Sequence, residues 1–204
     1  MIYDLNKLNN KNAVNDQFDV CIIGAGAAGI TLADNLSNYG SKVALCEAGS
    51  DEYSEKSQNN YKGKVIGDNY FELDIARLRF LGGSTNHWNG MCRPFSEIDF
   101  DRNYLGAKYI WPIKYEEIFK YQKQACKILE INNDFEFNNQ QKEKIKKIKF
   151  QFSPPVRFKD KYIKKLTNSK NISLFINSNL KDIFGDNAFI KTASFESYNK
   201  KEIS

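Results

Sequence analysis

The glycine-rich segment at residues 24–29 (GAGAAG) is the feature that most constrains what this chain can fold into. It follows a short apolar run at 18–23, whose β-branched residues predict a buried parallel strand. A helical pattern continues from the glycines to about residue 38, and a second apolar run at 42–47 predicts another strand. Strand, glycine turn, helix and strand within about thirty residues form a βαβ unit. We therefore expect an α/β fold.

The predicted helix carries apolar residues at helical spacing. Ala28, Leu32 and Leu36 lie four residues apart, and Ile30 and Ala33 widen the apolar face. This pattern predicts an amphipathic helix with these five residues on its apolar side.

The three glycines have the spacing G-x-G-x-x-G, and each has a mechanical role in binding a dinucleotide. Gly24 allows a tight turn off the strand, Gly26 lets the backbone approach a pyrophosphate, and Gly29 lets the helix pack closely on the strands. The N-terminus of the helix then presents unpaired N–H groups and about half a positive charge to the phosphates. The alternative interpretation is an ordinary glycine turn.

Glu47 ends the second predicted strand, 23 residues after Gly24. A carboxylate there can accept hydrogen bonds from both ribose hydroxyls of an adenosine, and it would repel a 2′-phosphate, which argues against NADP. The fingerprint alone does not decide between FAD and NAD. The position of the unit near the N-terminus and the sequence Glu47-Ala48-Gly49 favour FAD.

A second glycine-rich segment follows, and residues 77–88 (RLRFLGGSTNHW) resemble the flavin-contacting segment of the glucose–methanol–choline (GMC) oxidoreductases. The resemblance is closest to the branch of sugar oxidases and dehydrogenases. It continues in CRP at 92–94, in WPI at 111–113 and in FSPPVRF at 152–158.

The resemblance implies a Rossmann-like FAD-binding domain with an inserted, incomplete substrate domain. We expect residues 1–95 to form the first segment of the FAD-binding domain, 96–168 the start of the substrate or cap region, and 169–204 the return to the FAD-binding domain. The implied activity is oxidation of a CH–OH group of an alcohol or sugar, with hydride transfer to flavin N5. The electron acceptor is unknown.

The second motif has residues suited to a flavin. Small residues at Gly82, Gly83 and Ser84 let backbone N–H groups reach the pyrophosphate or the flavin edge. Thr85 and Asn86 offer short polar groups that can bond the flavin ring. The expected cofactor-binding residues are Gly24, Gly26, Ala27, Ala28, Gly29, Glu47, Ala48, Gly82, Gly83, Ser84, Thr85, Asn86, His87 and Leu180.

His87 is the only histidine of the chain. The resemblance to pyranose oxidases implies that a histidine at this position can be tethered covalently to the flavin, for which imidazole is a suitable neutral nucleophile. The alternative is a histidine that packs against the ring without a bond. We interpret Trp88 as an aromatic wall beside the flavin.

Alcohol oxidation also needs a base near the substrate hydroxyl. In the family this base is a histidine in the C-terminal third, paired with a second histidine or an asparagine. This chain offers no candidate, so we expect no catalytic residue in it and interpret it as a C-terminally truncated portion, inactive by itself. Two alternatives stay open: a catalytically incomplete FAD-binding module that needs a separate chain, and a different Rossmann flavoprotein such as a monooxygenase or an amine oxidase.

Composition excludes several other classes. The 30 basic and 25 acidic residues are mixed along most of the chain, and the basic run at 142–149 is interpreted as a solvated helix face, so no nucleic-acid partner is expected. Four cysteines without a C-x-x-C pair and a single histidine argue for free thiols and against a metal site. No run approaches the roughly 20 apolar residues of a membrane span, and we expect a cytoplasmic location.

Overall fold

The computed structural model describes residues 1–8, 17–100, 111–135, 147–199 and 202–203. The chain divides into two compact units, one formed by Met1–His87 with Arg157–Ser204 and the other by Trp88–Val156. The predicted boundaries fall after residues 95 and 168, whereas the second unit of the structure begins at Trp88 and ends at Val156.

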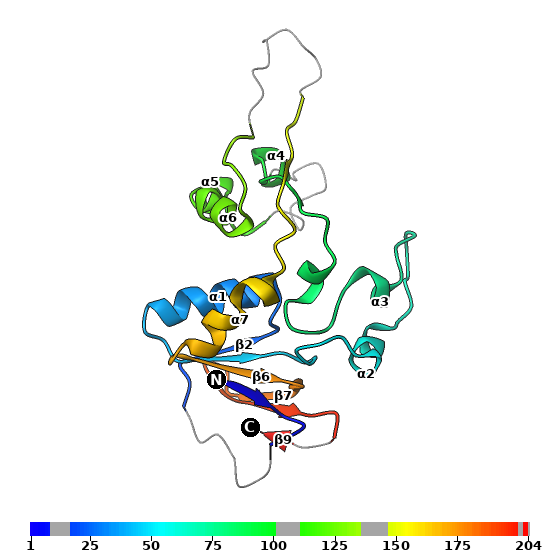
Figure 1. The fold of residues 1–204 in the computed structure, drawn as a ribbon, viewed down its shortest axis with the longest axis vertical. Helices are drawn as coiled ribbons and strands as arrows, with labels where there is room; N and C mark the ends of the chain where they lie inside the picture. Colours follow the sequence, from blue (N-terminus) through cyan, green and yellow to red (C-terminus); the bar gives the residue numbers. More distant parts are fainter. Residues whose placement is uncertain (9–16, 101–110, 136–146, 200–201, 204) are drawn as a thin grey trace. The chain divides into compact units, whose positions relative to one another are not determined.

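The first unit is built on a four-stranded parallel sheet (Figure 1). Its strand order is β1 (Ile2–Asp4), β6 (Ile172–Ile176), β3 (Val43–Cys46) and β2 (Val20–Ile23). Every residue of β3 is buried, as expected for an apolar strand with neighbours on both sides. The predicted α/β fold with a parallel sheet and a βαβ unit is confirmed.

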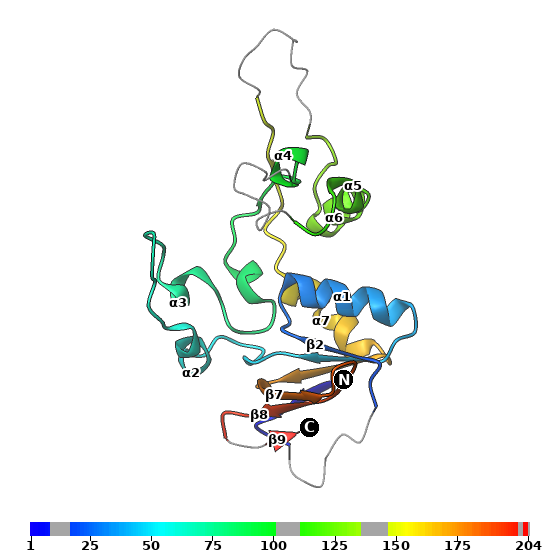
Figure 2. The same ribbon diagram turned by 180° about the vertical axis from the view of Figure 1, so that it is seen from behind.

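Helices α1 (Ala27–Asn38) and α7 (Phe158–Asn168) cover one face of this sheet (Figures 1 and 2). The face that α1 buries matches the predicted one only in part. Ile30 and Ala33 are fully buried, but Leu32 is 48% exposed and Ala28 is exposed. Residues 29, 30, 33 and 37 lie at helical spacing, and this stripe turns toward the sheet because Gly29 allows the closest approach there.

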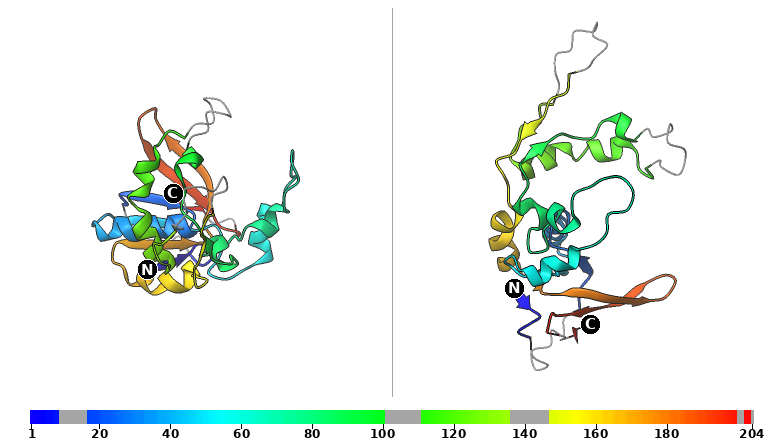
Figure 3. Two further views of the ribbon diagram at one scale, coloured as in Figure 1. Left: turned by 90° about the horizontal axis from the view of Figure 1, so that it is seen from above. Right: turned by 90° about the vertical axis from the view of Figure 1, so that its right-hand side faces the viewer.

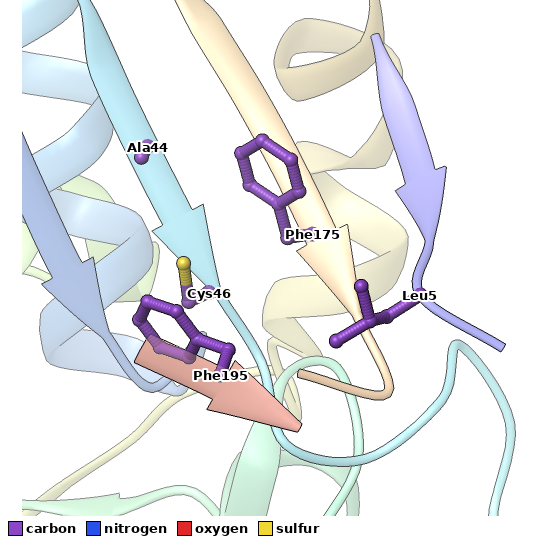
Figure 4. Packing of buried hydrophobic residues seen from close by; sticks show 5 residues of the cluster. All are labelled: Leu5, Ala44, Cys46, Phe175 and Phe195. Atoms are coloured by element: carbon purple, nitrogen blue, oxygen red, sulfur yellow. The ribbon is translucent and has the colours of Figure 1, made fainter. Parts of the chain in front are cut away.

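A small antiparallel sheet belongs to the same unit. It consists of β7 (Asn179–Gly185), β8 (Ile190–Glu196) and β9 (Glu202–Ile203), and the long β7–β8 hairpin is drawn in orange to red in Figure 3. Aliphatic and aromatic side chains fill the space between this sheet and the parallel one (Figure 4). They are Leu5, Ala44, Cys46, Phe175 and Phe195.

Strand β1 comes from a part of the chain with no strong strand pattern. It pairs with β6 in the register Ile2↔Leu174 and Tyr3↔Phe175. The Tyr3 and Phe175 rings stack with their centroids 5.0 Å apart. The chain therefore covers the outer side of β6 with its own first residues.

Between β3 and the second glycine motif the chain makes only short helices. These are α2 (Glu55–Gln58), the 3-10 turn η2 (Asn59–Tyr61) and α3 (Leu73–Ala76). The second motif itself contains the 3-10 turn η3 (Gly83–Asn86). The sequence of residues 49–75 shows only weak periodicity, in agreement with these short elements.

The second unit contains the two-stranded pair β4 (Met91–Cys92) and β5 (Gln151–Phe152) with helices α4 (Glu97–Phe100), α5 (Tyr115–Phe119) and α6 (Gln122–Leu129). Most of the basic run at 142–149 lies outside the described residues, and residues 147–149 are not helical. Among the helices of the described ranges, none is long and apolar enough to cross a membrane.

Candidate functional site

The first glycine turn connects β2 to α1 with a backbone that its glycines make possible. Gly24 has a φ of +100°, which favours glycine, and its N–H donates to the Cys46 carbonyl oxygen at 2.7 Å. A Cβ on Gly29 would lie 1.9 Å from the carbonyl oxygen of Gly24. The third glycine is therefore required for helix α1 to pack against the turn.

The outer side of this turn is open. A Cβ added to Gly24 or to Gly26 would meet no atom within 4 Å. Gly26 is the N-cap of α1, and no side chain of the described chain caps it or places an acidic group in the first helical turn. The free N–H groups and the partial positive charge of the helix end therefore lie beside space that the described residues leave unfilled, where a phosphate group has room.

Glu47 is buried directly beside the turn, with 6% of its surface exposed. One carboxylate oxygen accepts a hydrogen bond from the N–H of Ala25 at 2.9 Å, and the other accepts one from the N–H of Gly49 at 2.8 Å. Each oxygen can accept a further bond, so ribose binding by Glu47 stays a prediction. The bonds in the structure show a second role, because this carboxylate holds the backbone of the glycine turn.

The second glycine motif lies against the first, although 56 positions separate Gly26 from Gly82. The N–H of Gly82 donates to the Ala25 carbonyl oxygen at 2.8 Å. A Cβ on Gly83 would lie 3.2 Å from the Cα of Gly26. Gly82 and Gly83 both have positive φ values, +92° and +56°. The two predicted motifs thus form one backbone-lined site.

The polar side chains of the second motif make hydrogen bonds to the backbone of this chain. Thr85 Oγ1 donates to the carbonyl oxygen of Gly82 at 2.6 Å and accepts from the N–H of Phe158, the first residue of α7, at 3.2 Å. Asn86 Nδ2 donates to the carbonyl oxygens of Leu81 and Gly83, each at 3.0 Å. These bonds brace the turn, and contact of either side chain with the flavin stays a prediction.

The remaining predicted residues lie on several elements. Ala27 and Ala28 begin α1, and Ala48 follows Glu47. His87 follows η3 with an exposed side chain, and Leu180 is 39% exposed near the start of β7. Trp88 belongs to the second unit, where its indole Nε1 donates to the Val156 carbonyl oxygen at 3.1 Å.

Sequence reasoning missed the residues that hold the second motif in place. A Cβ on Gly49 would lie 2.1 Å from the Arg79 carbonyl oxygen, so the chain entering the motif passes directly over Gly49. Gln58 is buried, and its side-chain amide bonds the carbonyl oxygens of Asp74 and Arg77 and the N–H of Arg79. The local sequence gives no signal for the contacts of Gln58, and for the close approach at residue 49 its only signal is the glycine there.

Two thiols lie on the strands that carry the turn. A hydrogen bond with Cys46 lowers the pKa of the exposed Cys21 thiol to about 7, while burial acts in the opposite direction. The same bond, together with burial, raises the pKa of Cys46. All four cysteines are free, and the described residues contain no cluster of ligands suited to a metal ion.

Comparison with known proteins agrees with this geometry. Residues 19–124, more than half of the chain, match the family described as "DAO: FAD dependent oxidoreductase". The chain belongs to this family of FAD-dependent oxidoreductases. Its cofactor is FAD, and the unfilled space beside Gly24 and Gly26 leaves room for a phosphate group.

Among solved structures, a formate oxidase from Aspergillus oryzae RIB40 is similar, with a TM-score of 0.50 and 16% identity over 93% of this chain and 44% of that one. A pyridoxine 4-oxidase from Mesorbium loti has a TM-score of 0.48 and 14% identity over 92% and 47%. A second formate oxidase structure has a TM-score of 0.48 and 16% identity over 91% and 43%. This chain spans less than half of each. No curated protein matches the chain.

Proposed function

We propose that this chain is the FAD-binding part of a GMC-type oxidoreductase that oxidises a CH–OH group of an alcohol or sugar. The observation that carries the proposal is the contact between the two glycine motifs, in which Gly82 bonds Ala25 and Gly83 lies against Gly26. The first motif is shared by many Rossmann flavoproteins. The segment 82–88 (GGSTNHW) resembles GMC enzymes specifically, and the contact of its first two glycines with the first motif supports a role in extending the site toward the flavin.

The residues of this chain serve to bind and orient the cofactor. When bound, FAD supplies a hydride acceptor at N5. The first N–H groups of α1 bind the diphosphate, Gly26 leaves room for it, and Glu47 holds the turn and offers lone pairs to ribose hydroxyls. Small residues at Gly83 and Ser84 give backbone N–H groups access to the cofactor. No residue of this chain is assigned to the base that removes the hydroxyl proton.

His87 is proposed as the residue that can carry a covalent flavin. Its side chain is exposed and lies directly after the turn formed by residues 83–86. The test is to saturate the protein with FAD, denature it and separate protein from solvent. Yellow colour that stays with wild type but not with His87→Ala supports the bond, whereas colour lost entirely to the supernatant shows non-covalent binding.

A second candidate function is a module that binds FAD but needs further polypeptide for catalysis. The open edge of the parallel sheet favours it. Strand β2 pairs only with β3 among the described residues, and its Cys21 and Ile23 are exposed, the latter by 49%. Parallel sheets are normally covered on both faces, and exposed apolar edges are rare in stable proteins.

One experiment separates these possibilities. The protein is titrated with FAD and then given alcohols, sugars, amino acids or amines without oxygen, while the visible absorption of the flavin is followed. Bleaching by alcohols or sugars shows that the chain acts as the enzyme by itself, whereas bound FAD that no donor bleaches shows that further polypeptide must supply the base. Bleaching by amino acids or amines alone contradicts the GMC assignment.

A further inference from the structure

Arg79, three residues before Gly82, is a half-buried arginine whose hydrogen-bond partners are all neutral. Its Nη1 donates to the Tyr198 hydroxyl and to Ser57 Oγ, the latter at 3.3 Å. Its Nη2 donates to Asn179 Oδ1 at 2.9 Å. No ion pair found in the described part of the chain includes it. The guanidinium is thus held by hydrogen bonds of defined direction, without a carboxylate.

The three partners come from segments far apart in the sequence. Ser57 lies in α2, Asn179 begins β7, and Tyr198 follows β8. The Tyr198 hydroxyl donates to Ser57 Oγ at 3.0 Å, and Ser57 Oγ in turn donates to the Arg79 carbonyl oxygen at 2.8 Å. Each hydroxyl therefore donates one bond and accepts the bonds from Arg79, so that donors and acceptors match throughout the network.

The network fixes the backbone that leads into the second glycine motif. The Arg79 carbonyl oxygen lies where a side chain on Gly49 would be. Two residues further on, the N–H of Leu81 donates to the Ser50 carbonyl oxygen at 3.0 Å, and the N–H of Gly82 then bonds Ala25. Contacts thus fix the backbone at Arg79, Leu81 and Gly82 in turn, so a displaced Arg79 would displace the turn beside Gly26.

We propose that Arg79 is a positioning residue for FAD, which holds the second glycine motif at the separation from the first that the flavin half of the cofactor requires. The proposal rests on the cofactor site described above. Arginine suits this task because its rigid, planar fork donates in several fixed directions, whereas the ammonium of lysine is a compact group on a flexible stem. We therefore expect lysine not to replace it.

The test compares Arg79→Met and Arg79→Lys with Arg77→Met, which removes the same charge from an exposed position two residues away. Dissociation constants are measured for FAD and for ADP, which reaches the first glycine turn and Glu47 but has no flavin. We expect both Arg79 variants to weaken FAD binding about tenfold or more, as loss of charged hydrogen bonds implies. ADP affinity stays unchanged in them, and Arg77→Met changes neither constant.

Three results overturn the proposal. Unchanged FAD affinity in Arg79→Met shows that the network does not position the site. Equal losses of FAD and ADP affinity with a lower melting temperature show a role in stability alone. A wild-type chain that binds neither nucleotide refutes the cofactor site itself, and the proposal with it. If the Arg79 variants do not fold, Tyr198→Phe removes a single hydroxyl, and it too must weaken FAD binding but not ADP binding.

Discussion

Gly26 and Gly29 lie three residues apart, and the structure predicts opposite consequences when each is replaced by alanine. At Gly29 the new Cβ would lie 1.9 Å from the Gly24 carbonyl oxygen and 3.3 Å from Cγ2 of Ile22. The first contact involves backbone, which cannot rotate away. At Gly26 the new Cβ would meet no atom within 4 Å, and its φ of −84° suits any residue. One position is thus filled by the protein and the other is left open.

The expected magnitudes follow from these contacts. Overpacking of a well-packed site costs about 1–3 kcal/mol, and a clash with backbone belongs at the upper end. Gly29→Ala should therefore lower the free energy of unfolding by about 3 kcal/mol, out of the roughly 5–15 kcal/mol typical of a folded domain. Gly26→Ala should change it by less than about 1 kcal/mol. Its methyl group would instead enter the space assigned to the diphosphate and weaken FAD binding by about tenfold or more, a loss of about 1.4 kcal/mol.

Urea denaturation and FAD titration of the two variants measure these effects. Gly29→Ala should lower the denaturation midpoint, while Gly26→Ala should keep the wild-type midpoint and lose FAD affinity. If Gly26→Ala binds FAD as tightly as wild type, the diphosphate does not lie over this turn. If Gly29→Ala is as stable as wild type, the close packing of α1 against the turn is wrong.

Three further predictions concern neighbouring groups. Glu47→Gln replaces one of two carboxylate oxygens, each of which accepts a backbone N–H, with an NH2 group that cannot accept, so we expect a loss of about 1–3 kcal/mol in urea denaturation together with weaker FAD binding. Thr85→Val removes the hydrogen bond that the hydroxyl donates to Gly82 and the one that it accepts from Phe158, so the free energy of unfolding should fall by about 1 kcal/mol. Unchanged stability in urea denaturation would contradict this prediction. The Cys21 pKa of about 7, below the ordinary 9.0, predicts a midpoint of alkylation by iodoacetamide near pH 7, which Cys46→Ala should raise. Because the folded state favours the Cys21 thiolate, this group should add to the free energy of unfolding as pH rises from about 7 to 9. An alkylation midpoint near pH 9 in wild type would contradict the hydrogen bond between Cys21 and Cys46.

The sequence predicts the βαβ unit well because local patterns determine it. Apolar runs give β2 and β3, and the glycine spacing gives the turn between β2 and α1. The buried stripe of α1 could not be predicted from apolar periodicity alone. Exposed Leu32 belongs to the regular pattern, while Ser37 is buried because it lies on the side of the helix that faces the sheet.

Long-range features are beyond local patterns. Strand β1 has only three residues, and it forms because β6, about 170 positions later, offers an unpaired edge and the Phe175 ring. The apolar spacing over residues 114–129 indicates a single helix, but the N–H of Tyr121 bonds Ile118 three residues back and the chain divides into the two helices α5 and α6. The contact of Gly82 with Ala25 is made by backbone atoms, so it could not be predicted from the types of these residues.

The central claim is that FAD lies on two glycine turns which the fold brings together. Amide hydrogen exchange of the protein, with and without saturating FAD, tests it most directly. The account predicts that FAD slows exchange in two segments, residues 24–30 and 82–86, while the β7–β8 hairpin tip at 185–189 exchanges as before. Tight FAD binding that protects other segments and leaves both glycine turns unchanged would contradict the account.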